Sequence, residues 1–462
     1  MTAYGALWTG TSSPTLTRLN TGGSNLTVGT TVQPWGGMQR CNVNDQGIPV
    51  AWCTSSAGGC GYDDYGSNGQ VMVRVPAFYQ YTDTTGYTAT ATSNAQASSG
   101  QAVIDLTSTT GFTATAHPVV FITDGTNIDY GIISSVGSSP ASITLGANLA
   151  HTYASGATVT EYTTARWISN ALGDSIPLQN TNLNPNTHTI TAADLHPAFI
   201  VDGVAKPYAL VGAYEGYISS SKLQSIAGVT PTTVQTKATH RTAAELRGAG
   251  WELMTIQMYA ALQSLETIEY ASLNSQTTLG NGVSTGSLIN TGYTATAGTA
   301  PSGNASYGST SVTTAAMSYR GVENVYANIW KFVEGLRCDT SGNYWIAPQT
   351  NALTYSDSGA PSTPYINTGS ILPAGASLPT NVYTTGALSW AFLPSAEGGS
   401  VSTYFPDASD LAAIGTNEIF IVGNAPAMGT ACGLFAIGNV ASTATYYSAY
   451  YPIGARLQYF PQ

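Results

Sequence analysis

The sequence predicts an α+β fold with two main helices, short antiparallel strands and an inserted small all-β module. Three observations support this prediction. Short apolar runs separated by Gly, Pro, Asn and Ser recur along most of the chain, as expected for short strands. Two segments, 240–247 and 255–274, have the features of helices instead. The stretch from about Thr84 to Thr160 contains no Lys or Arg and is dense in Thr, Ser and Ala, which sets it apart.

The first part of the chain is predicted to be β-rich. Residues 1–69 consist of short apolar runs without a helical pattern, and we assign them as an N-terminal attachment or trimerisation segment. Directly afterwards, Val71, Val73 and Val75 alternate with Met72 and Arg74, which predicts a strand.

The segment 84–160 is predicted to form a small β module. Its strands are expected at intervals of roughly ten residues, as in small all-β units. The flanking segments 78–81 and 161–169 both resemble strands, so they are expected to pair with each other. The module would then be inserted at the tip of a hairpin, and the host domain would comprise 70–83 and 161–462. The expected module strands are 102–106, 118–123, 128–136, 142–145 and 157–162.

Two helices are expected in the second half of the chain. The segment 240–247 is followed by Gly248, a residue that favours helix ends. The segment 255–274 carries apolar residues near helical spacing, and Thr255 is suited to cap it. A loop rich in Gly, Ser, Thr and Asn is expected from there to about Thr314. A short helical patch at 322–336 should follow, with short strands to the end.

Composition excludes several classes of protein. Only 8% of the residues are charged, against about 25% in ordinary soluble proteins. The formal net charge is −11 and no cluster of Lys or Arg occurs, so a nucleic-acid partner is not expected. No run of 18 apolar residues and no signal-like N-terminus occurs, so neither membrane insertion nor a secretory leader is expected. Cys53 and Cys60 flank a Gly-rich turn and either pair or remain thiols. Metal-ligand spacings are absent.

The sequence gives little support for catalysis, and no cofactor is expected. Glu266 and Glu269 share a helix face, but a polar-face role explains them better than a glycosidase pair. The sequence contains no Gly-x-Ser-x-Gly, and its five histidines are scattered. We expect a core or capping role for His196, which precedes Pro197.

Several sequence blocks resemble one known family. The most specific is the block from Ser318 to Gly335, which contains Arg320-Gly-x-Glu-Asn-x-x-x-Asn-Ile-Trp330. The others are Met38–Gly47, Asn68–Tyr79, Leu195–Gly203, Val211–Gly216, Gly250–Ile256, Ile268–Gln276, Trp390–Ser395 and Gly454–Leu457. In this order they resemble phage tail-fibre proteins with a C-type-lectin-like domain, related to the major tropism determinant and more distantly to formylglycine-generating enzymes.

Within this resemblance, the block at 318–335 is interpreted as scaffold. Arg320 and Glu323 are expected to form an ion pair that anchors a turn, while Asn324 and Asn328 bind loop backbone. Trp330 and Phe332 should fill the core. The oxidase relatives use paired cysteines and copper, but the corresponding region here has only Cys432. The calcium-ligand motifs of sugar-binding lectins are also missing.

The resemblance implies a non-enzymatic receptor-binding protein at the virion surface, in a tail fibre or tail tip. Its partners would be a host cell-surface receptor, protein or glycan, and other virion tail proteins, and it would be a homotrimer. The family's binding face corresponds to 424–451, which is uncharged and ends in two Tyr-Tyr pairs, a composition that suits adaptable recognition. The candidate receptor-binding residues are Asn424, Met428, Thr430, Phe435, Asn439, Ser442, Tyr446, Tyr447 and Tyr450.

Three other functions remain open on the sequence alone. The chain would serve as a capsid decoration or baseplate component if its domain mediated only contacts between virion proteins. It would be an adhesin if the host cell itself displayed it, although no signal peptide is apparent. A carbohydrate hydrolase is the most distant alternative.

Overall fold

The fold is described from a computed structural model of the chain. It describes residues 2–8, 12–21, 24–53, 62–84, 89–114, 119–146, 148–161, 164–177, 187–296, 305–306, 316–350, 355–373, 375–411, 417–426, 428–441 and 452–462.

The chain is mostly β structure, with 39% of residues in strands and 12% in helices, arranged as many small antiparallel sheets. The predicted α+β class, a C-type-lectin-like domain with two main helices, is therefore wrong. The β-branched and aromatic residues that dominate the short apolar runs favour strands, and turn residues keep most of these strands short.

One region shows why helix content was overestimated. The helical patch predicted at 322–336 forms two strands instead, β24 (Val322–Glu323) and β25 (Trp330–Cys338). The turn before β25 contains residues with positive φ, a conformation that a right-handed helix does not allow. These residues are Asn324, Ala327 and Asn328.

Two sheets involve the N-terminal third of the chain. The first has the order β2-β1-β13-β6 and the second the order β21-β35-β18-β5-β3-β4. The first sheet consists of β1 (Tyr4–Trp8), β2 (Thr17–Asn20), β6 (Tyr79–Asp83) and β13 (Thr164–Ser169). The second consists of β3 (Gln39–Val43), β4 (Pro49–Trp52), β5 (Gln70–Pro76), β18 (Tyr208–Glu215), β21 (Trp251–Leu253) and β35 (Arg456–Tyr459).

The largest sheet belongs to the C-terminal third and follows the order β27-β26-β25-β32-β33-β31-β28, with β34 pairing β25 in parallel. Besides β25, its strands are β26 (Asn343–Ile346), β27 (Ile366–Ile371), β28 (Gly375–Ser377), β31 (Ser409–Leu411), β32 (Glu418–Val422), β33 (Ile437–Ala441) and β34 (Ile453–Gly454). The smaller sheets are built from β14 (Ser175–Pro177), β15 (Thr187–Thr189), β16 (Ile200–Val201), β17 (Val204–Ala205), β19 (Tyr217–Ser219), β20 (Lys222–Gln224), β22 (Ala305–Ser306), β23 (Met317–Tyr319), β24, β29 (Pro379–Val382) and β30 (Pro394–Glu397).

The two predicted longer helices exist, the first beginning and ending earlier than expected and the second shorter than expected. They are α1 (Lys237–Glu245) and α2 (Ile256–Tyr270), and the Thr255 side chain caps α2 by accepting from Met258 N. All residues of α2 except Tyr270 are buried, as expected for a helix enclosed by packed elements. The region predicted as a long loop contains α3 (Ser275–Leu279) and α4 (Tyr293–Thr296). The 3-10 turns are η1 (Trp35–Gly37), η3 (Ala192–Asp194), η4 (Pro197–Phe199), η6 (Gly386–Leu388) and η7 (Gly429–Ala431).

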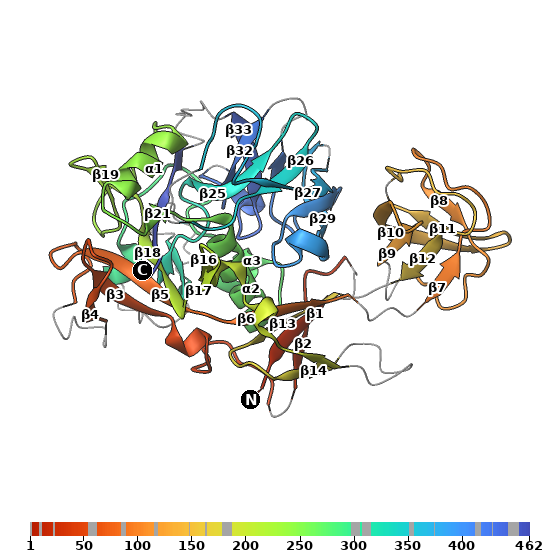
Figure 1. The fold of residues 1–462 in the computed structure, drawn as a ribbon, viewed down its shortest axis with the longest axis horizontal. Coiled ribbons are helices and arrows are strands. Elements are labelled where there is room, and N and C mark those ends of the chain that lie inside the picture. The colour runs from red at the N-terminus through yellow and green to blue at the C-terminus, as the bar shows by residue number, and fades with distance from the viewer. Residues whose placement is uncertain are drawn as a thin grey trace.

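The main body is organised around one large hydrophobic core. The core extends from Ala6 in β1 to Ile437 in β33 and includes the apolar residues of α2. Residues from the first 69 positions therefore pack against the same core as residues beyond 400. Figure 1 shows α2 in the interior of this body, among the sheets.

The segment between β6 and β13 forms a separate six-stranded sheet with the order β7-β12-β9-β10-β11-β8. Its core draws only on residues 89–159, and in Figure 1 it forms a lobe beside the main body, which it contacts where β10 meets β30. The predicted pairing of the flanking strands is confirmed, because β6 and β13 are antiparallel neighbours with Asp83 opposite Ala165. The strands are β7 (Thr90–Thr92), β8 (Val103–Asp105), β9 (Val119–Thr123), β10 (Ile128–Ser138), β11 (Ala141–Leu145) and β12 (Thr158–Glu161).

This connectivity predicts that the module can be removed. Replacing residues 85–163 by Asn-Gly places a two-residue turn between Thr84 and Thr164, directly after a pair already in antiparallel register. Since the two cores share no residue, the main body should keep its melting temperature within about 5 °C, roughly the shift of a 1–2 kcal/mol change in a protein of this size. Thermal unfolding followed by circular dichroism measures this. Loss of the cooperative transition would show that the body depends on the module.

Candidate binding site

Most of the predicted receptor-binding residues that the structure describes are not on the surface. Asn424, Phe435 and Asn439 are buried, with exposures of 0%, 3% and 7%. Phe435 packs against Phe392 and Phe405, and Asn439 lies on β33 inside the large sheet. Met428 is half-buried and packs against the main core, which leaves Thr430 as the exposed member.

The remaining predicted residues, Ser442, Tyr446, Tyr447 and Tyr450, lie outside the described residues. The same holds for Cys60, and so for its pairing with Cys53. The described part of 424–451 therefore provides mainly core contacts for β32 and β33, and it offers a ligand few accessible groups.

The scaffold interpretation of the block at 318–335 is supported, but its ion pair was predicted wrongly. Arg320 pairs with Glu269 of α2, with Nε 3.1 Å from Oε2, and it also donates to the carbonyls of Thr30 and Trp35. Glu266 and Glu269 are both fully buried, so the polar-face role expected for them is wrong as well. As predicted, Trp330 and Phe332 lie in a hydrophobic cluster.

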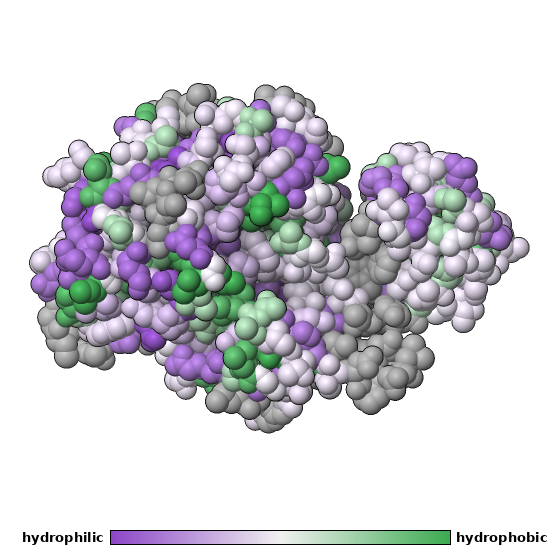
Figure 2. Space-filling model, viewed as in Figure 1, coloured by the Kyte–Doolittle hydropathy of each residue, from purple (hydrophilic) through white to green (hydrophobic). Residues whose placement is uncertain are grey.

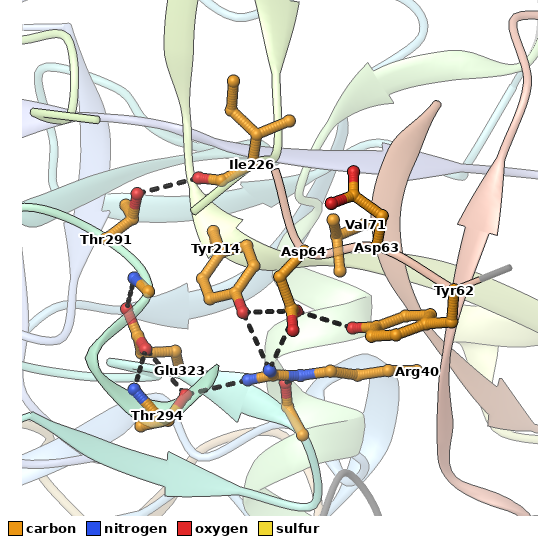
Figure 3. A network of polar contacts seen from close by, with 12 residues as sticks. Arg40, Tyr62, Asp63, Asp64, Val71, Tyr214, Ile226, Thr291, Thr294 and Glu323 are labelled. Atoms are coloured by element: carbon orange, nitrogen blue, oxygen red, sulfur yellow. Dashed lines mark hydrogen bonds and ion pairs between the residues drawn. The ribbon is translucent and has the colours of Figure 1, made fainter. Parts of the chain in front are cut away.

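Glu323 belongs to a different network, shown in Figure 3. Its carboxylate accepts from the backbone N–H groups of Gly292 and Thr294, both at 2.7 Å, and from the Thr294 hydroxyl at 2.6 Å. That hydroxyl accepts from Arg40 Nη2 at 2.8 Å, and Arg40 Nη1 donates to the Tyr214 hydroxyl at 2.8 Å. Both Arg40 and Glu323 are buried, so the network joins distant segments of the scaffold.

The basic side chains of this protein are withdrawn from its surface. All 13 Lys and Arg residues lie among the described residues, and none is classed as exposed. Four are half-buried, Arg18, Arg74, Lys206 and Lys222. The other nine are buried: Arg40, Arg166, Lys237, Arg241, Arg247, Arg320, Lys331, Arg337 and Arg456.

The surface that results is poorly suited to polyanions, because phosphate backbones are bound by exposed clusters of Lys and Arg. In Figure 2, hydrophilic, intermediate and hydrophobic residues are interspersed on the face shown. No described helix is long and apolar enough to cross a membrane.

An open groove of about 240 Å³ lies where three segments meet. Its sides come from β6, from the η3–η4 segment and from the turn after η6. The lining residues are Gln80, Tyr81, Thr82, Ala193, Asp194, Leu195, His196, Pro197, Ser389 and Trp390.

Hydrogen bonds hold the walls of this groove in place. The Thr82 hydroxyl donates to the Ser389 carbonyl at 2.8 Å, and Gln80 Nε2 donates to the Trp390 carbonyl at 3.3 Å. On the other side, His196 N donates to the Phe78 carbonyl at 3.1 Å. The expected core and capping role of His196 is confirmed, since it is buried and its Nδ1 accepts from Ala198 N at 3.2 Å. Burial lowers the pKa of His196 to about 3, so its ring is neutral.

One rim of the groove carries an ordered polar cluster. Asp194 Oδ2 accepts from Thr191 N at 2.7 Å and lies 3.0 Å from His188 Nε2. The His188 ring stacks on Tyr81, with centroids 3.7 Å apart and an interplanar angle of 7°. Burial, followed by the nearby carboxylates of Asp83 and Asp194, raises the pKa of the Tyr81 hydroxyl, so it is un-ionised. Within the described chain, Asp194 Oδ1 has no hydrogen-bond partner.

The lining of the groove combines aromatic rings, hydroxyls, an amide, one carboxylate and the neutral ring of His196, without Lys or Arg. No known protein family matches the chain, and no curated protein sequence does. Among the described residues, no group of three or more His, Cys, Asp or Glu side chains is placed to hold a metal ion. The arrangement is suited to reversible binding of an uncharged ligand.

This groove was not predictable from the sequence. Its three segments are separated by more than a hundred residues from one another, and each has a plain local explanation as strand or turn. The blocks Leu195–Gly203 and Trp390–Ser395 both belong to the family resemblance, but nothing in the sequence indicates that they meet.

Proposed function

We propose that this chain is a non-enzymatic receptor-binding protein of a phage virion, carried on a tail fibre or tail tip and directed at an uncharged host-surface receptor. The observation that carries the proposal is the scarcity of accessible basic groups, since nine of the 13 Lys and Arg residues are buried and the other four are half-buried. The surface then offers hydroxyls, amides, carboxylates and those aromatic rings that are accessible, such as Tyr65 and Tyr293. Interfaces use Tyr in this way because it brings a large contact area at a low cost in conformational entropy.

The resemblance of several sequence blocks to tail-fibre proteins supports the placement on a virion. The proposal does not depend on a C-type-lectin-like fold, which the β-rich architecture contradicts. The groove offers a preformed place for a receptor group, and preformed sites lose less entropy on binding.

Binding of the fluorescently labelled chain to a panel of bacterial strains tests the proposal. We expect saturable binding to at least one strain, and slower phage adsorption when unlabelled chain is added. Because only four cations are even partly exposed, binding should change less than about twofold between low salt and about 0.5 M NaCl, where surface charges are screened. Heat-denatured chain is the control. Saturable binding to no strain, or binding that high salt abolishes, would contradict the proposal.

Antibody labelling of intact virions tests the location. Gold particles at the tail or its tip are expected. Labelling over the capsid would instead support the structural alternative, a decoration protein that contacts only other virion proteins.

A further inference from the structure

We infer that the groove between β6, the η3–η4 segment and the turn at Ser389–Trp390 binds one ring of a neutral sugar. This inference rests on the proposed function and specifies the chemical class of the receptor. It requires only that a saccharide unit of the host surface enters the groove, with no bond made or broken.

The size of the groove favours a single ring. Pockets for drug-sized ligands measure about 300–1,000 Å³, whereas this groove measures about 240 Å³ and is open to solvent. A monosaccharide unit at the end or side of a longer glycan can occupy such a space while the rest of the glycan stays outside.

The lining has the chemistry that a sugar needs. A sugar ring presents C–H faces that pack on aromatic surfaces and hydroxyls that require polar partners. Trp390 and Tyr81 both line the groove and are half-buried, and the His188 ring already covers one face of Tyr81. Asp194 leaves Oδ1 free to accept from a hydroxyl, while its Oδ2 is already used by Thr191 and His188. Hydrogen bonds to a charged acceptor are stronger than neutral ones.

The electrostatics exclude an anionic sugar. Asp194 is the one carboxylate in the lining, and no Lys or Arg accompanies it. An acidic sugar would therefore meet a like charge without a compensating cation. A neutral saccharide has no such conflict.

A proline-rich peptide is the main competing occupant, because aromatic-lined grooves also bind polyproline helices. The polar share of the lining favours the sugar. Besides Trp390 and Tyr81, the groove exposes the side chains of Thr82, Ser389 and Asp194, whose oxygens suit hydroxyl partners better than a proline ring.

The test measures binding of neutral saccharides to the full chain by saturation-transfer NMR and calorimetry. The probes are glucose, galactose, mannose, N-acetylglucosamine and N-acetylgalactosamine, each up to about 10 mM, which covers the millimolar affinities expected of single-ring contacts. At least one should bind the wild-type chain. The decisive variant is Ala193→Trp, which adds bulk at an exposed lining position without removing any hydrogen bond that holds the walls.

We expect Ala193→Trp and Trp390→Ala each to weaken binding at least tenfold, and Asp194→Asn to weaken it three- to tenfold. The matched control is Tyr65→Ala, which removes an aromatic residue that is 59% exposed and outside the groove, and it should leave affinity unchanged. An unchanged melting temperature for Ala193→Trp establishes that the loss reflects the blocked groove rather than unfolding.

Three results would overturn the inference. Either no neutral saccharide binds, or saccharide binding is unchanged in Ala193→Trp, or a proline-rich peptide binds the wild-type chain instead and fails to bind that variant. Cell binding separates the inference from the proposed function. If Ala193→Trp still binds host cells like wild type, the receptor-binding role stands and the groove is not its site. If a saccharide binds in the groove but the chain binds no cell, the sugar site stands and the receptor-binding role fails.

Discussion

Replacing Glu334 by glutamine is expected to lower the free energy of unfolding by about 3–5 kcal/mol, the usual cost of leaving buried charges without their partner. Glu334 lies on β25 and is fully buried. Arg241 of α1 holds both of its oxygens, at 2.7 and 3.0 Å, and Lys237 Nζ lies 3.1 Å away. The variant would leave these two buried cations with the single carboxylate of Asp357. Urea denaturation measures the loss.

Two comparisons make this prediction sharp. Lys222→Ala removes a partly exposed ion pair with Asp45, 2.8 Å long, and should cost less than about 1 kcal/mol. The variant that replaces Lys237, Arg241, Glu334 and Asp357 together by Met or Leu should be less destabilised than Glu334→Gln, because no charge is then left alone. If Glu334→Gln costs no more than Lys222→Ala, the buried cluster does not stabilise the attachment of α1 to β25.

The second large effect concerns pH. Glu252 on β21 is fully buried, and neither of its carboxyl oxygens has a hydrogen-bond partner among the described residues. Burial, followed by the charges of Glu334 and Glu245, raises its pKa from 4.5 to about 9. Between these values the unfolded chain has released this proton while the folded chain keeps it. Stability therefore falls as pH rises, by about 1.4 kcal/mol for each pH unit.

Glu252→Gln should remove this dependence. From pH 6 to pH 8, the free energy of unfolding should fall by about 2–3 kcal/mol less in the variant than in the wild type. Glu266 and Asp407, whose pKa values burial raises to about 8, keep titrating in both proteins, so their contributions cancel in the comparison. The exposed substitution Asp105→Asn is the control and should follow the wild type. Equal pH dependence in the wild type and Glu252→Gln would contradict the raised pKa.

Local pattern predicted the strands better than the fold. The expected module strands all correspond to β8–β12, because turn residues bound each apolar run. The patch at 322–336 was mistaken for a helix because its apolar spacing fits one. The left-handed backbone at Asn324, Ala327 and Asn328 depends on contacts made elsewhere, such as Ile289 N donating to Asn328 Oδ1 at 2.8 Å. The spacing of apolar residues within the patch cannot show such contacts with distant segments.

The binding site was harder to predict for a related reason. An uncharged segment rich in Asn, Thr and Phe has the composition of a recognition surface. Composition does not show, however, which of its side chains are buried in the fold. Asn439 is buried because β33 lies between β31 and β32, and that order arises from contacts across the whole sheet. The groove likewise exists only once β6 and Trp390, about three hundred residues apart, have been brought together.

The burial of most Lys and Arg side chains affects how well the protein resists proteases outside the cell. Trypsin-like proteases cut the chain after Lys and Arg. They need the residues around the cleaved bond to be exposed and extended. In the folded chain, the side chains at these positions are buried or half-buried, and many of them lie within strands or helices. Cleavage at the nine buried positions must therefore wait for local or global opening, and its rate there reports how often the fold opens. A protein built in this way would persist in protease-rich surroundings for as long as its core stays closed.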